Sequence, residues 1–140
     1  MPVNTLDYSH VRLTVTDIVR SRAFYDAVFG FAIAYEAASA DADQATKDQL
    51  AFLAGGVIYH FPGGLLGLRP VAPAADSFDE NRVGLDHLSF AVPSLSDLEA
   101  AESLLGVLGV AHGGIKNLGT SYILEFRDPD NIALELFITA

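Results

Sequence analysis

The sequence predicts an α+β fold made of two βαβββ modules, which form a curved mixed sheet with a concave metal or ligand site. Three observations lead to this prediction: a repeated order of patterns in the two halves, strands with alternating apolar residues, and helices with apolar residues at the helical period. A chain of 140 residues is long enough for one compact domain. Two repeats are too few for a solenoid, so we expect the two sheets to lie side by side, with a helix on each outer face.

The first module is expected to span residues 1–75. It begins with an alternating strand at His10, and a segment with apolar residues at helical spacing follows and ends at Gly30. Three strand-like runs come next, at residues 31–36, 56–61 and 65–71. The Pro-Gly-Gly sequence before the last run predicts a hairpin turn. The acidic segment 41–48 and the residues up to 53 have no counterpart in the second half, and we expect a loop with a short helix there.

The second module is expected to span residues 83–140, after a polar linker at residues 76–82. It repeats the order from His87, and its helical segment starts at Ser94 or Ser96, with acidic residues in the first turn. Three strand-like runs follow, at residues 111–115, 121–127 and 132–138. An Asp-Pro-Asp-Asn sequence joins the last two runs and predicts a second hairpin turn.

Composition excludes several classes of protein. Hydrophobic residues make up 51% of the chain and charged residues 19%, which excludes intrinsic disorder. The absence of cysteine excludes disulfides, zinc fingers and thiol nucleophiles. Eighteen acidic against eight basic residues give a net charge of −10, which disfavours binding to nucleic acid or to an anionic membrane surface. There is no signal-peptide pattern and no apolar run long enough to span a bilayer, so we expect a soluble cytoplasmic protein.

Strand alternation places three potential metal ligands on the faces turned away from the helices. Side chains of a strand point to opposite sides in turn, so His10 and His87 lie on the face opposite the apolar residues of their strands. Glu135 likewise lies on the face opposite the apolar residues of its strand, in the run Ile-Ala-Leu-Glu-Leu-Phe-Ile. A carboxylate among apolar neighbours is costly to bury unless it is paired or bound to metal. Two imidazoles and a carboxylate suit a divalent ion with open coordination positions, and we predict such a site.

Further residues on these faces are candidates for substrate contact and proton transfer. Arginine side chains can hold an anionic substrate by bidentate hydrogen bonds. The alternative is a simple ion-pair network of these arginines with Glu125 or Glu135. Glu125 is either a general base beside the metal or a solvated strand residue, and an oxygen of Glu135 can also move a proton. The expected substrate-binding residues are Arg12, Arg69, Ser89 and Phe137.

Three segments resemble the vicinal oxygen chelate superfamily, which includes glyoxalase I, extradiol dioxygenases, fosfomycin-resistance transferases and bleomycin-resistance proteins. They are HVRLTVTD at residues 10–17, GLDHLSFAV at 84–92 and FRDPDNIALEL at 126–136. The resemblance implies metal ligands at His10, His87 and Glu135, and a homodimer. A fourth ligand often comes from the last strand of the first module. That place falls on Gly67 or Leu68, neither of which can ligate, and this disfavours glyoxalase I activity.

The resulting hypothesis is a metal-dependent enzyme that acts on a small oxygen-chelating substrate. The ion would act as a Lewis acid, and Fe, Mn, Zn, Ni and Co all suit the ligand types. Lyase, dioxygenase and thiol transferase chemistry remain open. The alternative is a metal-free binding protein similar to the bleomycin-resistance members, which would use its negative charge to hold a cationic ligand. A third alternative is a member without catalytic activity that senses a metabolite.

Overall fold

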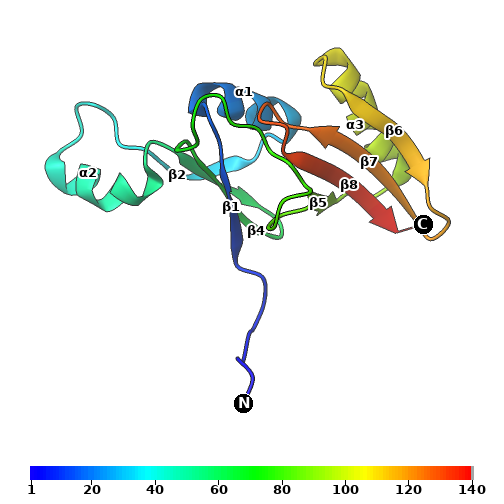
Figure 1. The fold of residues 1–140 in the computed structure, drawn as a ribbon, viewed down its shortest axis with the longest axis horizontal. Helices are drawn as coiled ribbons and strands as arrows, with labels where there is room; N and C mark the ends of the chain where they lie inside the picture. Colours follow the sequence, from blue (N-terminus) through cyan, green and yellow to red (C-terminus); the bar gives the residue numbers. More distant parts are fainter. Residues whose placement is uncertain (140) are drawn as a thin grey trace. The chain divides into compact units, whose positions relative to one another are not determined.

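The computed structural model describes residues 1–139. The chain divides into two compact units, Met1–Ala75 and Asp76–Ala140. Each unit holds one four-stranded mixed sheet, and each sheet has a helix across one of its faces (Figure 1). The α+β class and the repeated order of elements predicted from the sequence are therefore confirmed.

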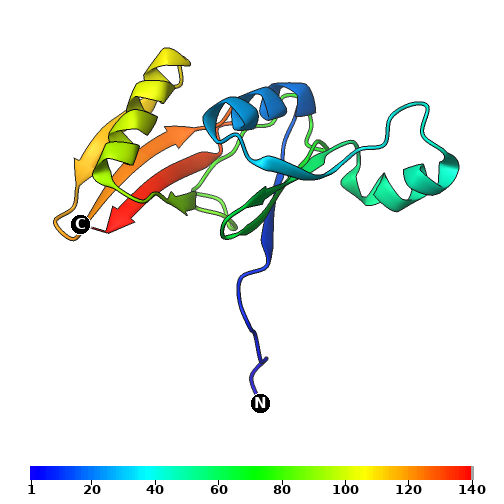
Figure 2. The same ribbon diagram turned by 180° about the vertical axis from the view of Figure 1, so that it is seen from behind.

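The first unit orders its strands β1-β4-β3-β2. The first strand runs parallel to the last, whereas the other two pairs are antiparallel. Asp17 caps α1 by accepting hydrogen bonds from the backbone nitrogens of Val19 and Arg20. The helix packs against one face of this sheet, where Leu13, Tyr25 and Leu66 are buried (Figure 2). The elements are β1 (His10–Thr14), α1 (Ile18–Val28), β2 (Ala32–Glu36), β3 (Val57–Phe61) and β4 (Gly64–Arg69).

The insertion between β2 and β3 forms two short helices, α2 (Gln44–Leu50) and η1 (Ala51–Leu53). The expected loop with a short helix is present, and its first helix begins inside the acidic segment. The reason is Asp43, whose side chain accepts a hydrogen bond from the backbone nitrogen of Thr46 at 2.8 Å and starts the helix. Leu53 is fully buried and anchors the insertion, whereas the neighbouring Phe52 is half exposed.

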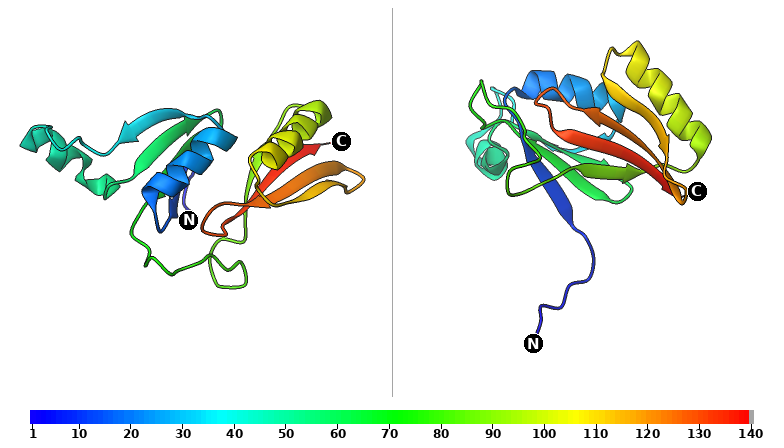
Figure 3. Two further views of the ribbon diagram at one scale, coloured as in Figure 1. Left: turned by 90° about the horizontal axis from the view of Figure 1, so that it is seen from above. Right: turned by 45° about the vertical axis from the view of Figure 1, so that its right-hand side comes forward.

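The second unit repeats this arrangement with the strand order β5-β8-β7-β6, and β5 runs parallel to β8. Of the two serines that the sequence offered as helix cap, Ser94 accepts a hydrogen bond from the backbone nitrogen of Asp97. Helix α3 contacts β6, β7 and β8, and Leu98 of the helix is buried together with Leu124 and Leu134 of the sheet (Figure 3). The elements are β5 (Leu88–Ala91), α3 (Leu95–Val107), β6 (His112–Asn117), β7 (Ser121–Arg127) and β8 (Ala133–Thr139).

The turn between β7 and β8 is held by its own first residue and by the segment that precedes β5. Asp128 Oδ1 accepts hydrogen bonds from the backbone nitrogens of Asp130 and Ile132, both at 2.8 Å. Asn131 takes a left-handed conformation with φ of 67°, which asparagine tolerates better than most residues. Arg127 donates two hydrogen bonds to Glu80, at 2.7 and 3.0 Å. The predicted linker is thus fastened to the second unit.

No helix among residues 1–139 is both long enough and apolar enough to cross a membrane.

Candidate functional site

His87 and Glu135 come together in the second unit. His87 directly precedes β5, and Glu135 lies on β8 as the Cα partner of Ser89. His87 Nε2 lies 4.0 Å from Glu135 Oε1. The Glu135 side chain is only 12% exposed, and Ser89 Oγ donates a hydrogen bond to its Oε1 at 2.7 Å. The pairing of two adjacent parallel strands therefore places an imidazole and a fixed, largely buried carboxylate side by side.

Asp86 fixes the orientation of the His87 ring. Its Oδ1 lies 2.6 Å from His87 Nδ1. A carboxylate can only accept, so Nδ1 carries the proton, and neutral His87 has its lone pair on Nε2, on the side of Glu135. The hydrogen bond to Asp86 raises the pKa of His87, and the charge of Glu135 adds to this effect. The ring is thus oriented as a metal-binding histidine is, with its other nitrogen hydrogen-bonded.

His10 lies in the first unit, at the start of β1, and has a similar neighbour. Ser9 Oγ lies 2.9 Å from His10 Nδ1. In both units the residue before the histidine therefore makes a hydrogen bond to Nδ1 and leaves Nε2 for another partner. The internal repeat extends from the order of elements to this local contact, which was not among the predictions from the sequence. The sequence feature that indicates this contact is a hydrogen-bonding residue directly before each histidine, Ser9 before His10 and Asp86 before His87.

Strand register decides where the first unit's equivalent of Glu135 lies. Arg12 is the Cα partner of Gly67 in the β1–β4 pair, just as Ser89 is the partner of Glu135 in the β5–β8 pair. Gly67 is therefore the position equivalent to Glu135. Leu68, the other possibility considered above, is fully buried on the opposite face. Since glycine has no side chain, the first unit has no carboxylate at this position.

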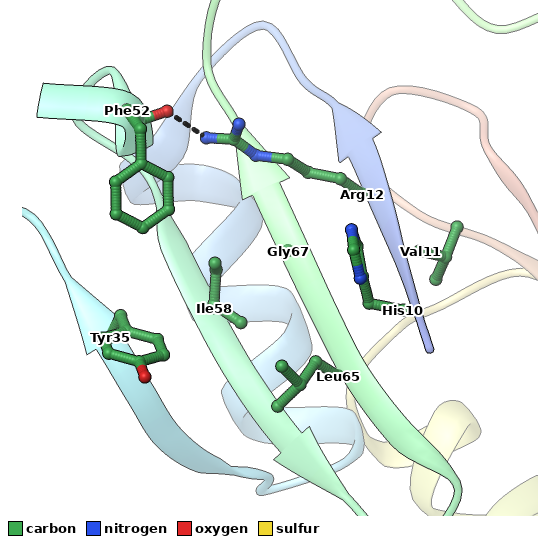
Figure 4. A pocket seen from close by; sticks show the side chains of 8 residues that line it. All are labelled: His10, Val11, Arg12, Tyr35, Phe52, Ile58, Leu65 and Gly67. Carbon is green, nitrogen blue, oxygen red and sulfur yellow. Dashed lines mark hydrogen bonds between the residues drawn. The ribbon is translucent and has the colours of Figure 1, made fainter. Parts of the chain in front are cut away.

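Arg12 occupies the space that a side chain at position 67 would need. A Cβ atom on Gly67 would lie 2.8 Å from Arg12 Cγ. The Arg12 side chain crosses β4 here, and its Nη2 donates a hydrogen bond to the carbonyl oxygen of Phe52 at 2.8 Å (Figure 4). Its Nε is buried, and within residues 1–139 it has no hydrogen-bond partner.

A pocket of about 420 Å³ opens around Arg12 on the face of the first sheet opposite α1 (Figure 4). Its walls are mostly apolar, and His10 stands beside Arg12 on β1. The lining residues are His10, Val11, Arg12, Tyr35, Phe52, Ile58, Leu65 and Gly67.

Glu125 lies on β7 opposite Glu135, as its Cα partner in the β7–β8 pair. Its Oε2 lies 2.6 Å from Lys116 Nζ, and both side chains are half exposed. Lys116 is not among the residues predicted from the sequence. Glu125 therefore pairs with this lysine, and Glu135 accepts a hydrogen bond from Ser89.

The remaining candidates lie near the ends of their strands. Arg69 ends β4 and is exposed. Phe137 follows Glu135 by two positions on β8 and is 36% exposed, so it shares a sheet face with that carboxylate. Among residues 1–139, no three His, Asp or Glu side chains form a group that could hold a metal ion. The structure thus brings together His87, Ser89 and Glu135, and separately brings His10 and Arg12 into one pocket.

A comparison with protein families identifies the chain's relatives. The family model described as the Glyoxalase/Bleomycin resistance protein/Dioxygenase superfamily matches residues 8–136. A comparison with curated proteins finds no match.

Solved structures support the same relationship. The chain is 31% identical to a glyoxylase/bleomycin resistance protein/dioxygenase domain from Frankia sp. EAN1pec, with a TM-score of 0.77, covering 98% of this chain and 100% of that one. The fosfomycin resistance protein FosX from Listeria monocytogenes is 18% identical, with a TM-score of 0.70 and coverage of 99% and 94%. A lactoylglutathione lyase from Agrobacterium tumefaciens is 18% identical, with a TM-score of 0.67 and coverage of 98% and 95%. The last two similarities concern the fold alone.

Proposed function

Because the chain belongs to the glyoxalase/bleomycin resistance protein/dioxygenase superfamily, we propose that it is a metal-dependent enzyme acting on a small oxygen-chelating substrate. In this proposal His87 and Glu135 of the second unit and His10 of the first unit hold one divalent ion. The observation that carries the proposal is the pair formed by His87 Nε2 and Glu135 Oε1, with each side chain held in place by a hydrogen bond from its own surroundings.

The chemistry of this donor pair fits a metal ion. The separation of 4.0 Å does not exceed the sum of two metal–ligand bonds, each roughly 2.0–2.2 Å long. Imidazole nitrogen and carboxylate oxygen suit Fe, Mn, Co, Ni and Zn. Metal-binding histidines usually donate their second ring nitrogen to a carboxylate or a carbonyl, and Asp86 accepts in this way from His87. The second unit thus supplies two ligands that hydrogen bonds already orient. His10 is the third ligand in the proposal.

A bound divalent ion would supply Lewis-acid stabilisation of negative charge that develops on a chelated substrate oxygen. The chain's own residues have the other roles in the proposal. Ser89 keeps Glu135 in one orientation through its hydrogen bond. Glu125, opposite Glu135 in the strand register, accepts the substrate proton once its ion pair with Lys116 opens. Arg69 and Phe137 contact the substrate, and the functional assembly is a homodimer.

Metal content tests the proposal directly. Protein purified without chelator or affinity metal, and then reconstituted with each candidate ion, is analysed by elemental mass spectrometry beside His87→Ala, Glu135→Ala and His10→Ala. His60→Ala is the matched control, because His60 is an exposed histidine on β3 that lies outside the proposed site. We expect close to one ion per chain in the parent and in His60→Ala, and a loss of the ion in the other three variants, all confirmed as folded by circular dichroism.

Two other results would change the proposal. If His10→Ala keeps its ion while the other two variants lose theirs, the ion is held by the second unit alone, and His10 has another role. If the parent binds none of the ions after reconstitution, the metal-dependent enzyme is ruled out. The metal-free binding protein then becomes the better account of the fold.

A further inference from the structure

We propose that the pocket of the first unit binds a carboxylate-bearing ligand with an apolar body, and that Arg12 is the residue that recognises the carboxylate. This inference names a substrate class for the proposed enzyme and in that sense rests on the proposed function. The pocket lies within one unit, however, and its ligand preference can be measured in protein from which metal has been removed.

The pocket floor is a row of residues across the sheet. Strand register aligns Arg12 with Gly67, Gly67 with Ile58, and Ile58 with Tyr35. Phe52 comes from η1 and lies beside this row, next to the Arg12 guanidinium (Figure 4). The row and Phe52 together therefore offer an apolar surface of one aliphatic and two aromatic side chains, with a guanidinium at one end of the row.

Gly67 is what permits this arrangement. Its missing side chain leaves room for the Arg12 stem, and a Cβ atom there would come within 2.8 Å of Arg12 Cγ. Without that space the stem would have to leave β4, and the guanidinium would lose its present place beside the Phe52 carbonyl. Glycine at position 67 thus has two consequences. It provides no metal ligand, and it leaves room for the arginine in the pocket.

The guanidinium retains donor capacity for a ligand. Arginine has five N–H donors, and the Phe52 carbonyl accepts from Nη2 only. Nε is buried and without a hydrogen-bond partner among residues 1–139. A buried donor without a partner costs free energy, and a bound acceptor removes that cost only where the groups covering Nε move aside. A carboxylate matches the planar fork of a guanidinium with two parallel hydrogen bonds.

Charge and size narrow the ligand further. The pocket is lined by one arginine and no acidic residue, although the whole chain has a net charge of −10. A single positive charge among apolar walls favours a monoanion over a phosphate dianion or a cation. The volume of about 420 Å³ lies within the range of small-molecule sites. A carboxylate on an aryl or alkyl body of modest length fits these conditions.

The experiment measures binding of matched probes to metal-free protein by isothermal titration calorimetry. The probes are phenylalkanoates from benzoate to 4-phenylbutyrate and hexanoate, each beside its neutral amide, with 2-phenylethylamine as the cationic probe. We expect at least one carboxylate to bind about tenfold more tightly than its amide, and the amine to bind more weakly than either. Equal affinity for acid and amide, a preference for the amine, or no binding of any carboxylate at millimolar concentration overturns the proposal.

Variants separate recognition from a purely structural role of Arg12. Arg12→Gln should abolish the difference between acid and amide, and Gly67→Ala should reduce it by displacing the arginine stem. Arg20→Gln, which makes the same charge change at an exposed position on α1, should leave the difference unchanged. Circular dichroism confirms that each variant is folded. If Arg12→Gln is folded and still prefers the acid, Arg12 only ties η1 to the sheet, and the proposal is wrong.

The outcomes of these measurements can be told apart from those of the metal proposal. Loss of metal in the His87→Ala and Glu135→Ala variants concerns the second unit, whereas the preference for acid over amide concerns the first. Failure of either proposal therefore leaves the other to be judged by its own measurement.

Discussion

Ser89 donates its hydroxyl hydrogen to Glu135 Oε1 at 2.7 Å, between two residues that are Cα partners on adjacent parallel strands. This contact holds a carboxylate that is only 12% exposed in one orientation beside His87. Polar groups with so little access to water need such partners, because an unmade hydrogen bond at a buried carboxylate is costly. Ser89, which we expected to contact the substrate, contacts a proposed metal ligand.

Ser89→Ala should weaken metal binding without removing a ligand. Loss of a hydrogen bond that orients a metal ligand typically lowers affinity by roughly 10–100-fold. The free energy of unfolding should fall by about 0.5–1.5 kcal/mol, since a single hydrogen bond is lost. Competitive titration with a metal-sensitive dye and urea unfolding measure the two quantities. Ser103→Ala, at an exposed position on α3, is the control and should change neither strongly. Unchanged affinity in Ser89→Ala would show that Glu135 does not depend on this contact.

Asp86→Asn should lower the pKa of His87 in metal-free protein. The hydrogen bond from Nδ1 to Asp86 is the main cause of the raised pKa, and the Glu135 charge is a smaller one. A raised pKa stabilises the folded protein below the ordinary histidine value near 6.5, and this contribution is lost as the pH rises through the folded pKa. Asp86→Asn should therefore lower the free energy of unfolding mainly at pH values below about 6.5. An NMR titration of the His87 ring measures the shift, with Asp76→Asn as control.

The Glu80–Arg127 ion pair should make stability depend on pH in the acidic range. Hydrogen bonding from Arg127 lowers the pKa of Glu80 from 4.5 to about 2. A lowered pKa contributes stability above the ordinary value, and that contribution disappears as the pH falls from 4.5 to about 2. The parent should thus unfold at higher urea than Glu80→Gln at neutral pH, and the difference should vanish below about pH 2. Glu99→Gln, on the exposed side of α3, should show no such dependence. A constant difference at all pH values would contradict the assignment.

Two glycine substitutions should have opposite effects on stability. A Cβ atom on Gly56 would lie 1.9 Å from the carbonyl oxygen of Leu68, so Gly56→Ala forces the backbone apart. We expect a loss of at least about 2 kcal/mol in the free energy of unfolding. A Cβ atom on Gly106, within α3, has no atom of its surroundings within 4 Å. Gly106→Ala should stabilise the protein by about 1 kcal/mol, because alanine favours the helix. Urea unfolding checks both, and a destabilised Gly106→Ala would contradict the helix argument.

Much of the fold follows from the sequence pattern. The alternating runs and the glycine-ended helical segments predicted the order of elements in both halves. Of the two positions that the sequence left open, the register aligns Gly67, and not Leu68, with Glu135. The reason is physical, since alternation and helical spacing are both direct consequences of which side chains each element buries. The proximity of His87 and Glu135 was predictable in the same way, because both lie on the face opposite the buried residues.

Two contacts near the candidate residues were not predictable from alternation. The β6–β7 pair has a register shift between His112 and Ile115, which reverses the faces of the residues that follow and turns Lys116 toward Glu125. Strict alternation of side chains from His112 onward would place Lys116 on the face of the sheet that α3 covers. The contact of Arg12 with the Phe52 carbonyl depends on where the irregular insertion folds, and no period in the sequence describes that.

The crossing of Gly67 by Arg12 also limits how this protein can change. Any side chain introduced at position 67, including the glutamate found at the equivalent place in the other unit, first has to displace the arginine stem. A carboxylate at position 67 and a smaller residue at position 12 are therefore expected to be tolerated together better than the carboxylate alone. The two positions should show strong non-additivity in a double-mutant cycle. A carboxylate ligand at position 67 would therefore require substitutions at both positions. Gly67 and Arg12 each depend on the identity of the other, and this dependence favours keeping the arginine in the pocket of the first unit.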